Sequence, residues 1–132
     1  MENQNVEQLI AQLKDKDIDV RQKAVESLRR AGAPAVEPLL IELLVARLDS
    51  EILVKIGAPT VEALIAALED AKNTSLDAQV AIVKILGMIG DERAVESLLN
   101  LATMHLDPYE TYYLDGLKMA AADALDKIRK AN

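Results

Sequence analysis

The sequence predicts an all-α protein, an α-solenoid (α-α superhelix) of about four helical hairpins. The first observation is a phrase of the form Val-Glu-x-Leu-(Leu/Ile), which begins at residues 6, 36, 61 and 95. A phrase that returns at intervals of roughly 20–50 residues indicates stacked units that bury their apolar faces against each other. The second is composition: hydrophobic residues make up 51% of the chain, yet it has no Phe, no Trp and only three Tyr. A core of small aliphatic side chains suits close helix packing better than a β-sandwich.

Each phrase is predicted to open the first helix of a unit. The apolar residues of the first copy have the i, i+3, i+4, i+7 spacing of one helix face: Val6, Leu9, Ile10 and Leu13. A glycine able to end the preceding helix stands before three of these helices: Gly32, Gly57 and Gly90. Pro34 and Pro59 suit helix starts, and Asp91 is the expected N-cap in the fourth unit.

A second helix is predicted in each unit. We expect one from about residue 19 to 31 and another from about 75 to 89. The last begins at Asp107-Pro108-Tyr109-Glu110, which has a capping-box arrangement, and continues to about residue 130, with Gly116 as a point where it can kink. The second unit is shortened, so its two helices either meet in a tight turn near 47–50, which we favour, or fuse into one long helix.

We expect one domain over 1–132, with units at about 1–32, 33–57, 58–90 and 91–132. The formal net charge is −7, which disfavours nucleic acid as a partner. The chain has no Cys, its N-terminus is polar and acidic, and its apolar runs are too short to cross a membrane. These features predict a cytoplasmic protein without a membrane partner.

Two segments resemble the HEAT-like repeats first defined in phycobilisome lyases. They are residues 32–40 and 90–99, and Asp17-Ile18-Asp19-Val20-Arg21 resembles that family's turn and second-helix start, including its characteristic Arg. The resemblance covers the chain as four units. It implies the fold, and it implies that the second helices line a concave face. It does not imply one function, since such repeats serve chromophore lyases, adaptors and regulators.

A ladder of charges follows the predicted second helices. Acids at one outward position are followed four residues later by bases in three units: Glu26 and Arg30, Glu51 and Lys55, and Asp123 and Lys127. The third unit has Lys84 and Met88 at these positions, beside Ala81. The ladder is explained either by solubility and helix stability or by a partner groove centred on Ala81, Lys84 and Met88, with Arg30, Lys55 and Lys127 along it.

All three tyrosines lie in the lengthened fourth unit. Tyr109, Tyr112 and Tyr113 follow closely on His105, in what we interpret as an irregular insertion over 103–115. Tyr is enriched at the energetic centres of protein interfaces. The alternative is that two of the three pack the final helix onto the third unit. Of all single patches, this one is the best candidate for partner contact.

No pattern of catalytic residues is present. Asp15, Asp17, Asp19 and Glu26 imitate a calcium loop, but Val20 stands where that loop needs Gly, so turn and capping acids are the better interpretation. One His and no Cys exclude the common metal and nucleophile motifs. We therefore expect no catalytic residues, no metal site and no cofactor.

The sequence favours a non-catalytic scaffold or adaptor that binds another protein. Its contact surface would be the concave second-helix face together with the tyrosine-bearing edge. One alternative, implied by the resemblance alone, is a subunit or fragment of a bilin lyase-like enzyme. Another is a self-associating structural domain, that is, a homo-oligomer.

Overall fold

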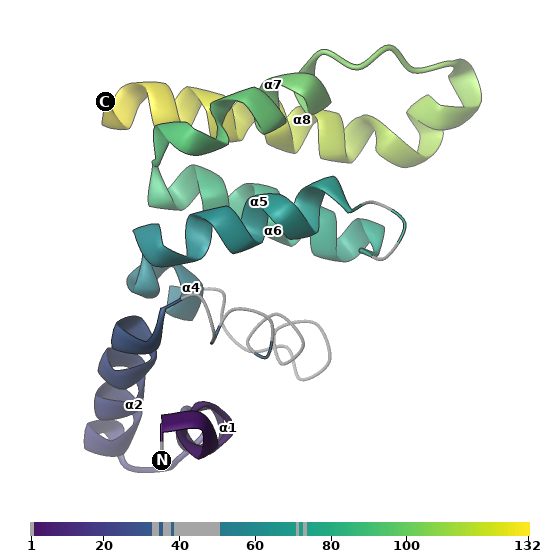
Figure 1. Cartoon of the computed structure of the whole chain (residues 1–132). Coiled ribbons are helices and arrows are strands. Elements are labelled where there is room, and N and C mark those ends of the chain that lie inside the picture. The colour runs from purple at the N-terminus through teal and green to yellow at the C-terminus, as the bar shows by residue number, and fades with distance from the viewer. Residues whose placement is uncertain (1, 33–34, 36–37, 39–50, 71, 73) are drawn as a thin grey trace. The chain divides into compact units, whose positions relative to one another are not determined.

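The computed structural model describes residues 2–32, 35, 38, 51–70, 72 and 74–132 (Figure 1). Among these residues all regular structure is helical, as the sequence predicts. The chain divides into two compact units, Met1–Ala63 and Leu64–Asn132, and each is described by itself. The expectation of one domain over 1–132 stays a prediction.

The first unit is built around two packed helices. α1 (Glu2–Gln12) packs against α2 (Ile18–Ala31), and α2 also contacts α4 (Glu51–Ile56). A 3-10 turn, η2 (Ala58–Thr60), follows α4 and leads to α5 (Val61–Glu69), which crosses the boundary between the units. The buried apolar residues of this part include Leu13, Ala24 and Leu28.

The turn between α1 and α2 is fixed by acids and one arginine. Asp15 Oδ1 accepts a hydrogen bond from the Asp17 N–H at 2.8 Å, and Asp17 Oδ1 accepts one from the Asp19 N–H at 2.9 Å, as the N-cap of α2. Arg21 donates to the backbone carbonyl oxygens of Asp15 (2.8 Å) and Lys16 (3.2 Å). These bonds satisfy backbone groups that a tight turn leaves unpaired. The calcium-like spacing is thus turn and capping chemistry, as predicted.

The second unit holds a core made by three helices. α6 (Leu76–Ile89) and α7 (Val95–Ala102) both pack against α8 (Pro108–Ala131), and Figure 1 shows the three stacked together. The contacts bury one side of each helix, with this core: Ile82, Val83, Leu86, Leu98, Leu117, Ala121, Ala124 and Ile128. Ser97 on α7 donates a 2.6 Å hydrogen bond to the Glu69 carboxylate at the end of α5.

The three glycines predicted to end helices do so. Gly32, Gly57 and Gly90 have φ of 68°, 78° and 80°, a region that side chains disfavour, and each N–H bonds back to a carbonyl of the preceding helix. The capping box of Asp107 and Glu110 is also present.

Two details of the helix starts were predicted wrongly. The repeated phrase opens α5 at Val61 and α7 at Val95, but α1 begins at Glu2, so there the phrase lies inside the helix. Asp91 caps the 3-10 turn η3 (Glu92–Ala94), which comes before α7, rather than α7 itself. The choice between a tight turn and one long helix in the second repeat lies outside the described residues. Within the described residues, no helix is both long and apolar enough to cross a membrane.

Candidate functional site

The tyrosines lie on a regular helix, not in an irregular insertion as the sequence suggested. The Asp107 carboxylate accepts the Glu110 N–H at 2.7 Å, and the Glu110 carboxylate accepts the Asp107 N–H at 3.2 Å. Pro108 occupies the first turn, where its missing N–H leaves no hydrogen bond unmade. The cap therefore starts α8 just before Tyr109 and sets the direction of all three tyrosines.

The three tyrosines form one contacting cluster on the surface. The ring centroids of Tyr109 and Tyr113 are 5.0 Å apart, and those of Tyr112 and Tyr113 are 5.2 Å apart, both edge-on at 62° and 77°. This geometry is favourable for aromatic pairs. Tyr109, Tyr112 and Tyr113 are 72%, 85% and 51% exposed. The alternative that two of them pack the final helix onto the third unit is thus wrong, because none is buried.

The cluster also has an internal polar contact. A side-chain hydrogen bond with Tyr109 raises the pKa of Tyr113 above its ordinary value of 10.0, and partial desolvation acts in the same direction. The contact with Tyr109 therefore favours the protonated form of the Tyr113 phenol. The rings support each other, which lowers the ordering cost of binding something against them.

The exposed apolar surface continues along α8 past the tyrosines. Met119 is 64% exposed. Gly116 lies between Tyr112 and Met119, four residues after the first and three before the second. Such spacings place residues on one helix face. We name this exposed face, made of Tyr109, Tyr112, Tyr113, Gly116 and Met119, the α8 stripe.

Gly116 has no visible packing role. No described heavy atom outside its own helix backbone and chain neighbours lies within 4 Å of a Cβ built there. Glycine inside a helix costs about 1 kcal/mol relative to alanine. At Gly87 on α6 the cost is offset by close helix packing, because a Cβ there would lie 2.9 Å from the Cα of Ala124 on α8. At Gly116 no neighbour in the described part of the chain packs closely enough to offset the cost of the glycine.

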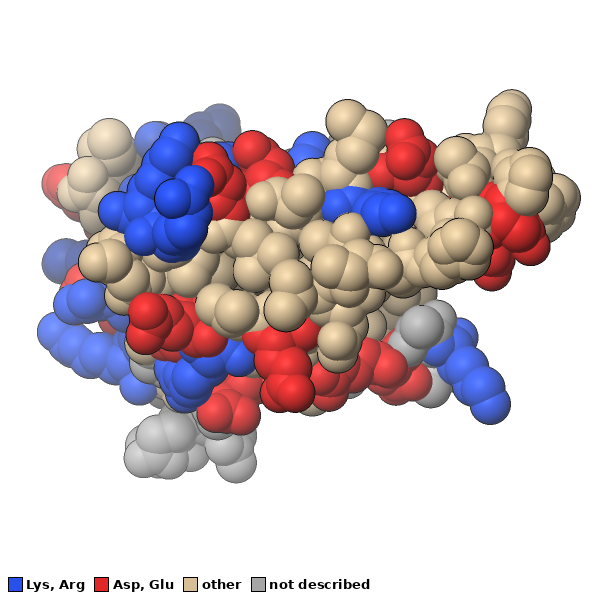
Figure 2. Space-filling model, turned by 90° about the horizontal axis from the view of Figure 1, so that it is seen from above, with Lys and Arg blue, Asp and Glu red and all other residues tan. Residues whose placement is uncertain are grey.

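Charged residues lie mainly around the α8 stripe rather than within it. Figure 2 shows mainly uncharged residues in the middle of the face that α7 and α8 form, with acids and bases toward its margins. The cap residue Glu110 and the exposed Asp115 are acids at the tyrosine end of α8. A centre poor in charged residues with a charged rim is the usual anatomy of a protein-binding surface.

The candidate groove residues of the third repeat lie on the outward side of α6. Lys84 and Met88 are exposed, Met88 at 45%, and Ala81 is half-buried. Met88 follows Gly87, the residue at which α6 touches α8, so Met88 lies beside the α6–α8 contact. These residues and the α8 stripe therefore belong to the same compact unit.

The charge ladder is present only in part. Lys127 pairs with Asp123 at 3.5 Å, as predicted. Glu26, however, pairs with Arg29 at 2.9 Å rather than with Arg30, because the residue three positions on presents its guanidinium in reach. The Arg29 hydrogen bond and charge lower the pKa of Glu26, and the charge of Arg30 adds to this. The side chain of Glu51 lies outside the described set.

The remaining predicted residues are divided between the two units. Arg30 and Lys55 are exposed and belong to the first unit, whereas Lys84, Met88, Lys127 and the tyrosines belong to the second. His105 is exposed on the segment between α7 and α8. The described residues bring no three His, Cys, Asp or Glu side chains together where they could hold a metal ion.

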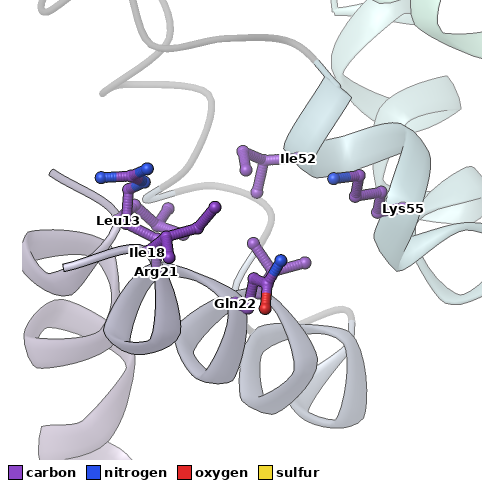
Figure 3. Close-up of a pocket in the computed structure, with 7 residues that line it drawn as sticks. Leu13, Ile18, Arg21, Gln22, Ile52 and Lys55 are labelled. Carbon is purple, nitrogen blue, oxygen red and sulfur yellow. The ribbon is translucent and has the colours of Figure 1, made fainter. Parts of the chain in front are cut away.

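The first unit contains a cavity that sequence reasoning missed. Its volume is about 360 Å³, and Figure 3 shows side chains from α2 and α4 around it; the lining residues are Leu13, Ile18, Arg21, Gln22, Val25, Ile52 and Lys55. Aliphatic walls and two cations would suit an apolar group bearing an acid, although Arg21 also holds the α1–α2 turn. One feature of the sequence could have pointed to this cavity: Ile18 is an apolar residue among charged ones at the start of α2. The structure shows that its side chain is exposed.

The chain matches the family model described as PBS lyase HEAT-like repeat, at residues 20–46 and 78–103. Each match begins inside a second helix, α2 or α6, and Gly32 and Gly90 stand at the same distance from the two starts. The described helices within the two matches are α2, α6 and α7, whose packing is given above. The chain therefore contains HEAT-like repeats. Its fold is the all-α solenoid class that the sequence predicts.

The matched segments include residues whose structural roles are described above. Gly32 and Gly90 end the first helix of each match, and Arg21, near the start of the first match, holds the preceding turn. HEAT-like repeats generally mediate protein interactions, and the family description includes a lyase. No curated protein matches the chain significantly.

Proposed function

We propose that this chain is a non-catalytic scaffold or adaptor. It binds another protein through the second-helix face of its second unit, and the α8 stripe is the main contact. The observation that carries this proposal is the exposed, mutually supported cluster of Tyr109, Tyr112 and Tyr113.

Exposed aromatic clusters need an explanation in a small protein. Single apolar residues at the surface are normal, but contiguous apolar patches mark binding surfaces. Tyr combines a large apolar area with few rotatable bonds and one polar group, which is why it dominates interface energetics. Here the rings already contact each other and rest on a capped helix, so little further ordering is needed on binding.

Residues on α6 extend the contact. Met88 is a flexible apolar side chain that adapts to different partners, and Lys84 adds a positive charge beside it. Together with Ala81 they form the second edge of the proposed surface. A partner that fits would bring apolar side chains to the α8 stripe and an acid toward Lys84.

Capture of binding partners from the native organism would test this function. The tagged wild-type chain is compared with Tyr112→Ala, Met88→Glu and the control Leu99→Ala, which removes an exposed apolar side chain from α7. We expect the first two variants to lose the captured proteins and the control to retain them. Retention by all three variants would overturn the proposal.

A bilin lyase-like role is the second candidate, favoured by the family description of the matched repeats. Mixing the chain with a bilin and an acceptor protein tests it. Covalent transfer of the bilin, seen as visible absorbance on the denatured acceptor, would establish the lyase role instead.

A further inference from the structure

The part of the chain that carries the tyrosines has acids but no bases. Residues 94–117 include no Lys or Arg, and they include these acids: Glu96, Asp107, Glu110 and Asp115. The bases of α8 begin only at Lys118, after the tyrosine cluster. The tyrosine end of α8 is therefore locally negative, in a chain whose formal net charge is −7. Positive charge on a partner would complement this end of the helix.

The acids of α8 differ in whether the helix itself neutralises them. Those of the C-terminal half have ion-pair partners four residues on: Asp123 with Lys127 at 3.5 Å, and Asp126 with Lys130 at 3.0 Å. Asp115, nearer the tyrosines, is exposed and makes no ion pair within the described residues, including with Lys118 three residues on. Its negative charge is therefore available to a group from outside the chain.

Asp115 lies beside the most exposed ring of the cluster. It follows Tyr112 by three residues, a spacing that makes two side chains neighbours on a helix surface. Tyr112 is 85% exposed, and an edge-on contact with Tyr113 at 5.2 Å between centroids supports its ring. The face of an aromatic ring attracts a cation, as a carboxylate does. An exposed ring and an unpaired carboxylate side by side thus offer two groups to one cation.

We propose that the tyrosine end of the α8 stripe binds an arginine-bearing segment of a partner protein. The guanidinium stacks on the Tyr112 ring and donates hydrogen bonds to the Asp115 carboxylate. Arginine fits this site better than lysine, because its planar group stacks on aromatic rings and presents paired donors to a carboxylate. An apolar neighbour of that arginine covers Met119, which is 64% exposed four residues after Asp115. This inference rests on the proposed function, because it names the chemistry of the partner at the same surface.

The chain carries its own reporter of this site. It has no Trp, and its three tyrosines all belong to the cluster, so intrinsic tyrosine fluorescence comes only from the α8 stripe. The full chain is titrated with a capped peptide of alternating leucine and arginine, and with a counterpart in which citrulline, similar in shape but uncharged, replaces arginine. We expect saturable binding of the arginine peptide and at least about tenfold weaker binding of the citrulline peptide. Salt should weaken binding of the arginine peptide, because it screens the attraction.

Variants of the chain locate the cation. Asp115→Asn should raise the dissociation constant of the arginine peptide about fivefold. The matched control Asp123→Asn removes the same charge from an acid that is already paired, and should change it less than about twofold. Tyr112→Leu should weaken binding about fivefold, whereas Tyr112→Phe, which keeps the aromatic face, should bind like the wild type. All three positions are exposed, so the variants should keep their helical circular dichroism.

The outcomes separate this inference from the proposed function. Equal affinity for the arginine and citrulline peptides, or no binding of the arginine peptide, would overturn the arginine-bearing partner. Equal weakening by Asp115→Asn and Asp123→Asn would also overturn it, because the attraction would then be to the negative chain as a whole. In these cases the proposed function stands if Tyr112→Ala still loses the captured proteins. Capture that Tyr112→Ala and Met88→Glu both leave intact overturns the proposed function, and this inference with it.

Discussion

Gly87 on α6 lies directly against Ala124 on α8: a Cβ on residue 87 would be 2.9 Å from both the Cα and the Cβ of Ala124. Such contacts are shorter than packed carbon atoms tolerate, so the two helices can approach this closely only because residue 87 lacks a side chain. The contact sets the position of α8, and with it the surface on which the tyrosines stand.

Gly87→Ala should destabilise the chain. The added methyl group overpacks the α6–α8 contact, which costs about 1–3 kcal/mol. The better helix propensity of alanine offsets roughly 1 kcal/mol of this. The urea midpoint of unfolding should fall, and a variant as stable as the wild type would show that the helices are farther apart than described.

Gly116→Ala should have the opposite effect. The methyl group meets no described atom, so the helix propensity gain of about 1 kcal/mol appears in full. The measurement is the urea midpoint of unfolding. A loss of stability would reveal an intramolecular contact at this position.

Removal of the α8 cap should loosen the tyrosine cluster. Asp107→Ala removes the side-chain acceptor of the Glu110 N–H, which is one of the two hydrogen bonds of the capping box, at a cost of about 1 kcal/mol. Amide hydrogen exchange of residues 109–112 should become faster, while exchange of 120–128 stays slow. Asp107→Asn, which keeps an acceptor, is the matched control and should show a smaller change.

Two carboxylates should make stability depend on acid pH. Hydrogen bonds from Arg93 lower the pKa of Asp91, and those from Lys130 and Arg129 lower that of Asp126, both from 3.8. Their stabilising contribution is therefore complete above pH 3.8 and is lost as the pH falls through the lower folded-state values. The urea midpoint should drop over that interval. The double variant Asp91→Asn with Asp126→Asn should flatten this drop, and an unchanged drop would assign it to other groups.

Tyr112→Ala and Met88→Glu should leave the fold intact. Both side chains are exposed, at 85% and 45%, and exposed positions change the free energy of unfolding by about 0.5 kcal/mol or less. Thermal unfolding followed by circular dichroism measures this. A large loss of helix would assign these residues to the core and would remove them from the binding surface.

The helix ends were predictable because their chemistry is local. Gly57 and Gly90 end helices by adopting a positive φ, and Asp107 caps α8 through atoms three residues apart. Such features need no knowledge of the rest of the fold. Arg21 was singled out only through the resemblance to HEAT-like repeats, and its carbonyl partners, Asp15 and Lys16, were not predicted.

The candidate site was less predictable, because burial depends on which face of α8 meets its neighbours. Ala121 and Ala124 are buried together with Leu117 and Ile128, while Tyr112 and Met119, which are larger than the alanines, are exposed. Size and apolarity alone therefore do not identify the buried face. Gly116 could be noticed in the sequence, but only the empty space around it distinguishes it from Gly87. The cavity of the first unit is lined by residues that are distant in sequence, so it could not be predicted from a local pattern. The apolar Ile18 among charged residues was the one feature of the sequence that pointed to it.

The most direct test of the central claim is the dissociation constant of the complex between this chain and its bound partner, measured for the wild type and for Gly116→Leu. Binding through the α8 stripe predicts that the leucine raises the dissociation constant at least tenfold, with the free energy of unfolding of the chain equal to or above that of the wild type. An unchanged dissociation constant would show that the partner binds elsewhere and would contradict the role given to the tyrosine-bearing face.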